Sequence, residues 1–330
     1  MNTESKARRF SIKFGFLVVM VMAVVTFGVA NPVFLSWSNL FSILLGVTVY
    51  AILALGETFP LVINGMDLSI GSTAALSVMV SSYAMVVLQL SAAWAFGICI
   101  ALGALVGLCN GILIVRLKIP DLLTTLGTMF LIQGLQLIPS AGRSIGNGMV
   151  LANGDSAAGT FDPAFKFLGQ GRLFGILPVP VLFMLLIALI VFVVLSLTRW
   201  GRTFYAIGGN SEAARLAGAN INAYRIVAYV VSGTIAAFAG VILAARIGRG
   251  DVSSGGTLLM DAIGSALIGF AVLGAQRPNP FGTIVGAIFL GVLMNGLTML
   301  NMPYFWQDFI KGCVLVAALA FTFGLSKKGK

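Results

Sequence analysis

The stretch Leu177–Thr198, LPVPVLFMLLIALIVFVVLSLT, contains no charged residue, and Arg199 follows it directly. A membrane-spanning α-helix needs about 20 consecutive apolar residues. Such a helix also satisfies its own backbone hydrogen bonds, as the water-free bilayer core requires. The stretch therefore predicts a transmembrane helix that ends at a charged boundary.

The whole chain has the same character. Of its 330 residues, 59% are hydrophobic and 9% are charged, and there is no His. A soluble protein would be about one quarter charged and less than half apolar. The composition excludes a soluble globular enzyme, a disordered protein and an ordinary nucleic-acid-binding domain. The net charge of +10 does not form one basic patch, because the basic residues lie at the ends of apolar runs.

Ten apolar runs are separated by polar, Pro or Gly residues, and they predict an all-α, polytopic membrane protein with about ten transmembrane helices. The 40 glycines fit closely packed membrane helices. The runs are approximately 14–30, 40–62, 68–89, 92–115, 121–139, 177–198, 223–245, 257–275, 281–299 and 305–325. The least certain boundary is 56–72, where Glu57, Pro60, Asn64 and Asp67 interrupt the pattern and a broken or re-entrant segment is an alternative.

The distribution of Lys and Arg predicts that both termini are cytoplasmic. Inner segments tend to carry more basic residues than outer segments. With the N-terminus inside, fourteen basic residues fall on the inner side and five on the outer side. The inner set is Lys6, Arg8, Arg9, Lys13, Arg116, Lys118, Arg199, Arg202, Arg215, Arg225, Arg277, Lys327, Lys328 and Lys330; the outer set is Arg143, Lys166, Arg172, Arg246 and Arg249. We expect the first apolar run to be a retained helix, although it could be mistaken for a signal peptide.

No linker divides the chain, so we expect residues 1–330 to form a single transmembrane domain. Two loops are long, an outer one at about 140–176 and an inner one at about 199–222. A weak internal repeat relates the fourth and ninth runs, which is a pattern typical of inverted-repeat transporters. In the fourth run Gly103-Ala104 is followed by Asn110-Gly111 and Pro120, and in the ninth Gly286-Ala287 is followed by Asn295-Gly296 and Pro303. Chance matching of Gly and Ala in apolar sequence is the alternative.

The inner loop contains a short, well-delimited helix. Asn210 or Ser211 can cap its N-terminus, Glu212 favours the positive end of the helix dipole, and Gly218 permits a left-handed stop. Its alanine-rich middle offers a narrow projection that another protein could hold. An ordinary capped connector is the other interpretation.

These residues also carry a resemblance. The run GRTFYAIGGNSEAARLAGAN at 201–220 resembles ribose/galactose-type ABC transporter permeases, as do NGMDLSIGS at 64–72 and PDLLTTLGTM at 120–129. Asn64 stands where that family usually has Gly. The resemblance implies that the short helix is a coupling helix that docks into a cytoplasmic ABC ATPase. It further implies a second permease copy or paralogue and an extracytoplasmic solute-binding protein as partners. The residues that it assigns to ATPase coupling are Asn210, Ser211, Glu212, Ala213, Ala214, Arg215 and Gly218.

The chain has no phosphate-binding G-x-x-x-x-G-K-[ST] loop, no His-containing catalytic set and no cluster of metal ligands in its sequence. We therefore expect no catalytic residue, no metal and no cofactor in this chain, with ATP bound by the partner ATPase. The three cysteines Cys99, Cys109 and Cys313 lie in apolar runs, and we expect them to pack without forming disulfides.

The polar residues within the runs are candidates for a translocation path. Ionisable groups at membrane depth need a partner or a cavity. Asp308 and Lys311 can pair across one helix turn, and Asp67 can either cap a helix near Leu68 or contact substrate. Asp261 and Glu57, the latter in a Gly-Glu-Thr break, could each line the path or form a buried pair. Uncharged Asn, Gln and Thr bind a sugar without trapping it, although Asn110 and Asn295 could instead join helices. The path candidates are Asn64, Asp67, Asn110, Thr124, Thr125, Gln133, Gln136, Asp261 and Asn295.

The leading hypothesis is the permease subunit of a bacterial ABC importer in the inner membrane. It would form a path for a monosaccharide or similar small polar solute, driven by a separate ATPase. The alternative is an ion-coupled secondary transporter that works without an ATPase. A channel or scaffold is a third reading, which the lack of a charged pore ring disfavours.

Overall fold

The structure is a computed structural model, and it describes residues 6–151, 154–270, 272 and 277–326. Lys327, Lys328 and Lys330, on which part of the charge argument rests, lie outside the described residues, as do residues 273–275 of the eighth predicted run. The described part is helical except for loops and one short antiparallel hairpin. The predicted all-α class is therefore confirmed.

The helices begin and end close to the predicted apolar runs. The long ones are α1 (Lys6–Ala30), α2 (Trp37–Val62), α3 (Ile70–Val86), α4 (Ala92–Arg116), α5 (Asp121–Leu135), α7 (Val179–Phe192), α10 (Ile221–Ile247), α11 (Gly256–Ile268), α12 (Pro280–Met299) and α13 (Tyr304–Ser326). The short elements are the 3₁₀ helices Pro32–Leu35 and Ile138–Ser140, α6 (Pro163–Gln170), β1 (Arg172–Leu173), β2 (Leu177–Pro178), the π-helix Val193–Leu197, α8 (Arg199–Gly209) and α9 (Ser211–Leu216).

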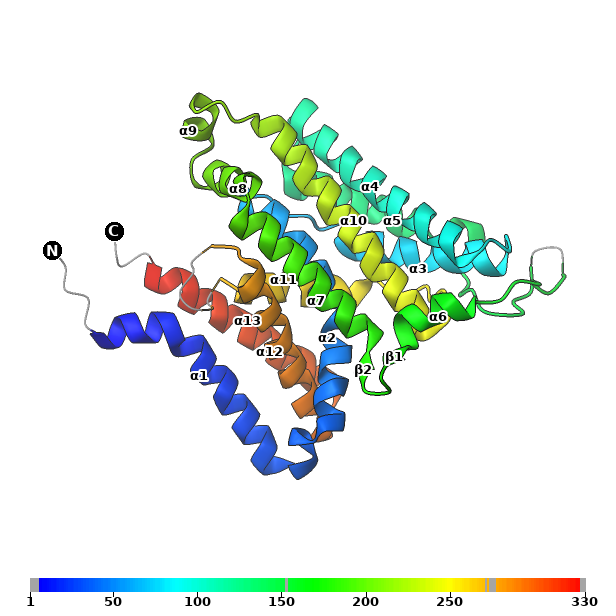
Figure 1. The fold of residues 1–330 in the computed structure, drawn as a ribbon, viewed down its shortest axis with the longest axis horizontal. Coiled ribbons are helices and arrows are strands. Elements are labelled where there is room, and N and C mark those ends of the chain that lie inside the picture. Colours follow the sequence, from blue (N-terminus) through cyan, green and yellow to red (C-terminus); the bar gives the residue numbers. More distant parts are fainter. Residues whose placement is uncertain (1–5, 152–153, 271, 273–276, 327–330) are drawn as a thin grey trace.

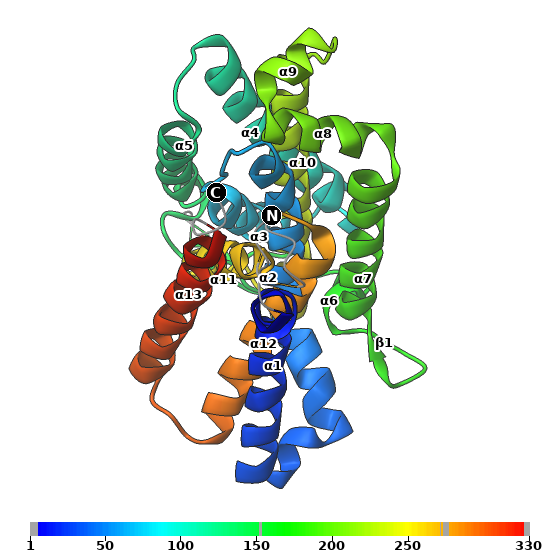
Figure 2. The ribbon, with the colours of Figure 1, turned by 90° about the vertical axis from the view of Figure 1, so that its left-hand side faces the viewer.

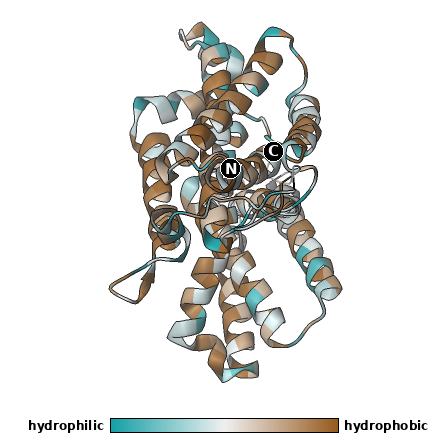
Figure 3. Ribbon diagram, turned by 90° about the vertical axis from the view of Figure 1, so that its right-hand side faces the viewer, coloured by the Kyte–Doolittle hydropathy of each residue, from teal (hydrophilic) through white to brown (hydrophobic). Residues whose placement is uncertain are grey.

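Six helical segments within the described residues are long and apolar enough to cross a membrane, and hydrophobic residues predominate along them in Figure 3. They are Trp37–Val62, Ala92–Arg116, Asp121–Ser140, Val179–Leu197, Ile221–Ile247 and Pro280–Met299. Three further apolar helices are shorter, at Phe16–Ala30, Ile70–Val86 and Gly256–Ile268.

Helix α10 forms the centre of the bundle and packs against α4, α3 and α2. Small residues allow its close approach to α4, because side chains would otherwise separate the two backbones. A methyl group added at Gly107 of α4 would clash with the carbonyl oxygen of Tyr229 on α10. On the other side of the bundle α12 packs against α2 and α11, and Gly286 similarly lies against the backbone of Ser265.

The two ends of the bundle carry different elements. Helices α8 and α9 project at one end, whereas α6 and the β1–β2 hairpin lie at the opposite end (Figure 1). The first described turn of α1 and the last described turn of α13 are on the side of α8 and α9, and Figure 2 shows the same separation from a second direction. The two long loops predicted from the sequence thus lie at opposite ends of the helices.

The second predicted run ends where α2 ends, at Val62, and the break that was an alternative for 56–72 is confined to residues 63–69. Glu57 does not lie in a break: α2 continues through Pro60 to Val62, so Glu57 is a helical residue that is fully buried. Pro60 lies in the last turn of α2, so the hydrogen bond that it cannot donate is lost next to the end of the helix. Residues 63–69 form the non-helical junction, and Asn64 has a left-handed backbone with φ of 60°. Asn is one of the few residues that adopts this conformation readily.

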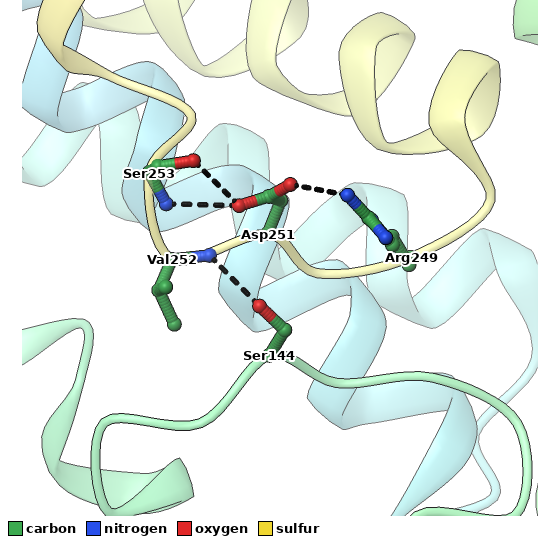
Figure 4. A network of polar contacts seen from close by, with 5 residues as sticks. All are labelled: Ser144, Arg249, Asp251, Val252 and Ser253. Atoms are coloured by element: carbon green, nitrogen blue, oxygen red, sulfur yellow. Dashed lines mark hydrogen bonds and ion pairs between the residues drawn. The ribbon is translucent and has the colours of Figure 1, made fainter.

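The long loop at about 140–176 is held against the segment between α10 and α11. Ile145 and Gly250 exchange backbone hydrogen bonds of 2.8 and 2.7 Å, and the Ser144 hydroxyl accepts from the Val252 amide at 3.4 Å (Figure 4). The backbone amide and hydroxyl of Ser253 donate to Asp251, which lowers the pKa of that carboxyl. Phe174, at the tip of the hairpin, is 97% exposed.

Candidate functional site

Helices α8 and α9 form an angled pair whose ends are fixed by side-chain caps. The Thr198 hydroxyl accepts from the Gly201 amide at 3.3 Å, and the Asn210 side chain accepts from the Ala213 amide at 3.0 Å. Gly218 has φ of 89° and ends the segment. The short helix predicted from the sequence is confirmed, with Asn210 rather than Ser211 as its cap.

The two faces of α9 differ in exposure. Ser211, Ala213 and Leu216 are exposed, with Leu216 at 79%, and Glu212 pairs with Arg215 on the surface. Ala214, in contrast, is buried in the same apolar cluster as Phe204 of α8. One side of the alanine-rich middle of α9 is therefore buried, because Ala214 packs against the rest of the molecule.

Helix α8 is attached directly to the end of α2. Its Phe204 ring packs edge-on against Phe59 of α2, with centroids 5.7 Å apart. A methyl group at Gly208 would clash with the carbonyl oxygen of Val62. The Asn64 side chain donates to the Gly208 carbonyl oxygen at 2.6 Å, which links α8 to the 63–69 junction.

A second link joins α8 to the segment before α12. The Tyr205 hydroxyl donates to the Pro278 carbonyl oxygen at 2.8 Å, and the Arg277 guanidinium lies 4.8 Å from the Tyr205 ring centroid. Both contacts involve the segment between α11 and α12 rather than the α2–α3 junction.

A buried polar centre lies where the junction meets α2 and α10. The Asp67 amide donates to Glu57 Oε1 at 2.9 Å. Asp67 Oδ1 accepts from the amide of Ser69 at 3.0 Å and from its hydroxyl at 2.6 Å, and Oδ2 accepts from the Ser232 hydroxyl at 2.9 Å. Both carboxyl oxygens of Asp67 are thus bonded to protein, and its bonds to Ser69 form a local turn just before α3, whose N-cap residue Ser69 makes no side-chain cap bond. Glu57 Oε2 is buried and has no partner among the described residues.

Asn110 connects this centre to α4 and α5. It is fully buried, its side-chain amide nitrogen donates to the Ser69 hydroxyl at 2.9 Å, and its oxygen accepts from the Thr128 hydroxyl at 2.7 Å. The interhelical role that the sequence left open for Asn110 is therefore what the structure contains. Asn295 also joins two helices, because it exchanges two hydrogen bonds of 2.9 and 3.0 Å with Asn39 of α2.

The N-terminus of α5 forms further hydrogen bonds to the 63–69 junction. Asp121 Oδ2 accepts from the Met66 amide at 3.2 Å and from the Tyr229 hydroxyl at 3.3 Å, and the Thr125 hydroxyl donates to the Met66 carbonyl oxygen at 3.3 Å. Gly65 fits between them, since an added methyl carbon would lie 2.6 Å from the Tyr229 hydroxyl.

Two cavities flank the junction and share Asn64, Gly65 and Asp121 in their walls. One, of about 330 Å³, also reaches Lys118 and Arg225, and the other, of about 690 Å³, also reaches Tyr205 and Arg277. Both are therefore lined by cationic groups as well as by Asp121.

The remaining path candidates lie on α5, at its C-cap and on α11. The Thr124 hydroxyl and the Gln136 Oε1 atom are buried without a partner among the described residues, and Gln133 is half-buried.

Asp261 of α11 pairs with Lys311 of α13 at 2.7 Å, whereas Asp308 lies 3.8 Å from Lys311. The predicted Asp308–Lys311 pair is thus secondary to a partly buried interhelical pair that sequence spacing could not reveal.

Several members of the polar centre were missed by the sequence analysis. Ser69, Thr128, Ser232 and Tyr229 are ordinary polar residues within apolar runs, and only their convergence from different helices distinguishes them. Asp121 had a usable signal, because it follows Pro120 at the start of the 121–139 run. Within the described residues no group of His, Cys, Asp or Glu is arranged to hold a metal ion.

Comparison with known proteins gives consistent matches along the chain. The family model described as "Branched-chain amino acid transport system / permease component" matches residues 39–319. The ribose import permease protein RbsC of Escherichia coli K12 is 32% identical over 92% of this chain and 91% of its own length. RbsC of Bacillus subtilis 168 is 32% identical over 97% of this chain and 96% of its own length.

Two other relatives are named for different sugars. The D-allose transport system permease protein AlsC of E. coli K12 is 30% identical over 98% of this chain and 97% of its own length. The galactose/methyl galactoside import permease protein MglC of the same strain is 31% identical over 92% and 91%. No solved structure matches the chain.

The family model covers most of the chain, and the relatives align with it nearly end to end. The chain therefore belongs to the family of branched-chain amino acid transport system permease components.

Proposed function

We propose that this chain is the membrane-embedded permease subunit of a bacterial ABC importer in the inner membrane. It forms the path for a monosaccharide or similar small polar solute and is driven by a separate ATPase. The observation that carries the proposal is the nearly end-to-end similarity to import permeases named for ribose, allose and galactose. The partners are a cytoplasmic ATPase, a second permease copy or paralogue and an extracytoplasmic solute-binding protein.

Ten membrane spans with both termini inside are part of the proposal. The spans are α1 to α5, α7 and α10 to α13; of the three shorter apolar helices, α3 and α11 are largely buried and α1 is largely exposed. The position of the described ends of α1 and α13 on the side of α8 and α9 supports this topology (Figure 1). The excess of basic residues on that side supports it as well.

An inverted repeat that relates α2–α5 to α10–α13 also belongs to the proposal. The supporting feature is reciprocal packing: α4 and α3 pack on α10, as α12 and α11 pack on α2. In addition, α3 packs on α4 as α11 packs on α12. Each pair of contacts would be exchanged by an axis relating the two halves, as in transporters built from internal repeats.

The α8–α9 pair is the proposed ATPase contact, with Asn210, Ser211, Glu212, Ala213, Ala214, Arg215 and Gly218 as coupling residues. Its caps and the buried Ala214 make it a compact body that can move as a unit. Dimerisation of the ATPase would displace this body and change which side of the membrane the path faces. The exposed Glu212–Arg215 pair and Leu216 offer the partner both charge and apolar contact.

The translocation path is proposed to run along α5 and the 63–69 junction. Thr124, Thr125 and Gln133 lie on α5, Gln136 is its C-cap residue, and Asn64 lines both cavities of the junction. A buried polar atom without a partner costs about 1–3 kcal/mol. The unpaired atoms of Thr124 and Gln136 are therefore expected to bind water or solute hydroxyl groups. Asp67, Asn110, Asp261 and Asn295 would act mainly by holding the neighbouring helices in place.

The direct test is uptake of radiolabelled D-ribose, D-galactose and D-allose by cells with and without the gene. Loss of uptake of at least one sugar, restored by the intact gene, supports the proposal. The ion-coupled transporter is the competing outcome: uptake that persists after the neighbouring ATPase gene is deleted, and that collapses with the ion gradient, would favour it. Normal uptake of all solutes in the absence of this gene would overturn both.

A further inference from the structure

We infer that Asn64 is a positioning residue for transport, which ties α8 to residues 64–66 so that a displacement of α8 reaches the N-terminus of α5. The inference rests on the proposed function, because it assumes that the α8–α9 pair is displaced by an ATPase. The segment Asn64–Met66 is called the 64–66 ridge below.

The first link is a hydrogen bond that completes a helix end. The last four carbonyl groups of an α-helix have no intrahelical partner. Gly208 is the second-last residue of α8, and its carbonyl oxygen accepts from the Asn64 side chain at 2.6 Å. Asn64 can present its side chain in this direction because its backbone is left-handed, with φ of 60°. The Asn64 bond thus satisfies an acceptor at the end of α8 from a different part of the chain.

The second link is steric. Gly208 lies so close to the carbonyl oxygen of Val62 that an added methyl group would clash with it. This steric contact opposes movement of α8 toward Val62, and the Asn64 hydrogen bond opposes movement of α8 away from Asn64. The end of α8 is therefore linked by steric contact to Val62, the last residue of α2, and by the hydrogen bond to Asn64 of the ridge.

The third link joins the ridge to α5. Met66 is held through both of its backbone polar groups, since its amide donates to Asp121 and its carbonyl oxygen accepts from Thr125. Tyr229 donates to the same Asp121 carboxylate and fixes its orientation. A displacement of the ridge is thus delivered to the first turn of α5.

Helix α5 is suited to respond because few elements hold it. It packs on α3, on α4 and on the 3₁₀ turn that follows it. Much of its remaining face is exposed, including Leu122, Leu123, Phe130 and Leu131. The Tyr205–Pro278 bond supplies a separate attachment of α8 to the segment before α12, so loss of the Asn64 bond should weaken coupling without releasing α8.

The test compares Asn64→Gly with wild type in proteoliposomes that contain the permease, its neighbouring ATPase and its solute-binding protein. Glycine accepts the left-handed backbone but has no side chain to donate. The matched control is Asn301→Gly, which replaces an exposed Asn at φ of 55°. Asn64→Asp is the second variant, because it keeps the size of the side chain while presenting only acceptors to the Gly208 carbonyl group.

We expect Asn64→Gly to lower the amount of sugar imported per ATP hydrolysed by about two- to tenfold, the range for one lost neutral hydrogen bond. The maximal ATPase rate should stay at the wild-type value, Asn64→Asp should lower the ratio further, and Asn301→Gly should leave it unchanged. A wild-type ratio in Asn64→Gly would overturn the inference. So would a parallel fall of uptake, ATPase rate and thermal midpoint, because that pattern indicates only a folding defect. If the wild-type protein imports sugar without the ATPase, the proposed function fails instead.

Discussion

Replacing Asp67 by Ala tests whether the buried polar centre holds the bundle together. In the structure Asp67 accepts three hydrogen bonds, from the amide and hydroxyl of Ser69 and from the hydroxyl of Ser232. A buried donor that loses its partner costs about 1–3 kcal/mol. The hydroxyl groups can turn toward other acceptors, so we take the low end of the range, about 1 kcal/mol for each donor. The three donors together then give an expected loss of about 3 kcal/mol in the free energy of unfolding.

The assay is the thermal midpoint of the detergent-solubilised protein. At about 2 °C per kcal/mol for a chain of this size, Asp67→Ala should lower the midpoint by about 6 °C. Asp67→Asn should remain within about 1 kcal/mol of wild type, because its oxygen still accepts from Ser69 and its amide nitrogen can donate to Ser232. Asp308→Ala is the matched control, since the Asp308 side chain is mostly exposed and lies 3.8 Å from its partner.

Uptake separates the structural role of Asp67 from direct contact with solute. If Asp67 mainly joins Ser69 before α3 to Ser232 of α10, Asp67→Asn should keep uptake within about threefold of wild type, consistent with a change of less than 1 kcal/mol. An unchanged midpoint in Asp67→Ala would refute the hydrogen-bond reasoning. Loss of uptake in Asp67→Asn with a normal midpoint would show that the negative charge acts in the path.

Three other predictions follow from individual contacts. Gly107→Val should prevent accumulation of folded protein in the membrane, because the side chain meets the α10 backbone, whereas Gly127→Val, which has no neighbouring atom within 4 Å, should accumulate normally on immunoblots. Lys311→Met should lower the thermal midpoint by leaving the largely buried Asp261 carboxylate unpaired, at a cost of about 3 kcal/mol, and adding Asp261→Asn should recover most of the loss; additive losses would contradict this pairing. Glu212→Lys should abolish sugar uptake at an unchanged midpoint, because the exposed pair contributes about 0–1 kcal/mol to stability, and wild-type uptake would remove Glu212 from the coupling residues.

The sequence was sufficient for the features that depend on local pattern. Apolar runs such as Leu177–Thr198 predicted the positions of helices, because the length of a membrane span fixes the length of the run. Capping chemistry predicted α9, since Asn210 and Gly218 have conformational preferences that act over a few residues. Both inferences needed no knowledge of which helices are neighbours.

The features that depend on tertiary packing could not be predicted in the same way. Asp261 pairs with Lys311 across two helices, and Asn110 meets Ser69 and Thr128 from three separate segments. Glu57 was expected in a break because Gly56 and Pro60 lie near it, yet α2 continues through both residues to Val62 as a segment buried among other helices. The inward orientation of Ala214 likewise depends on its packing against the cluster that contains Phe204.

The central claim is that this chain holds a path but no source of energy. The most direct measurement is sugar uptake into vesicles containing the purified chain alone, compared with vesicles that also contain its ATPase and receive the solute-binding protein and ATP. The account predicts accumulation in the complete system and none in the chain alone under imposed proton or sodium gradients. Concentrative uptake by the chain alone would contradict it.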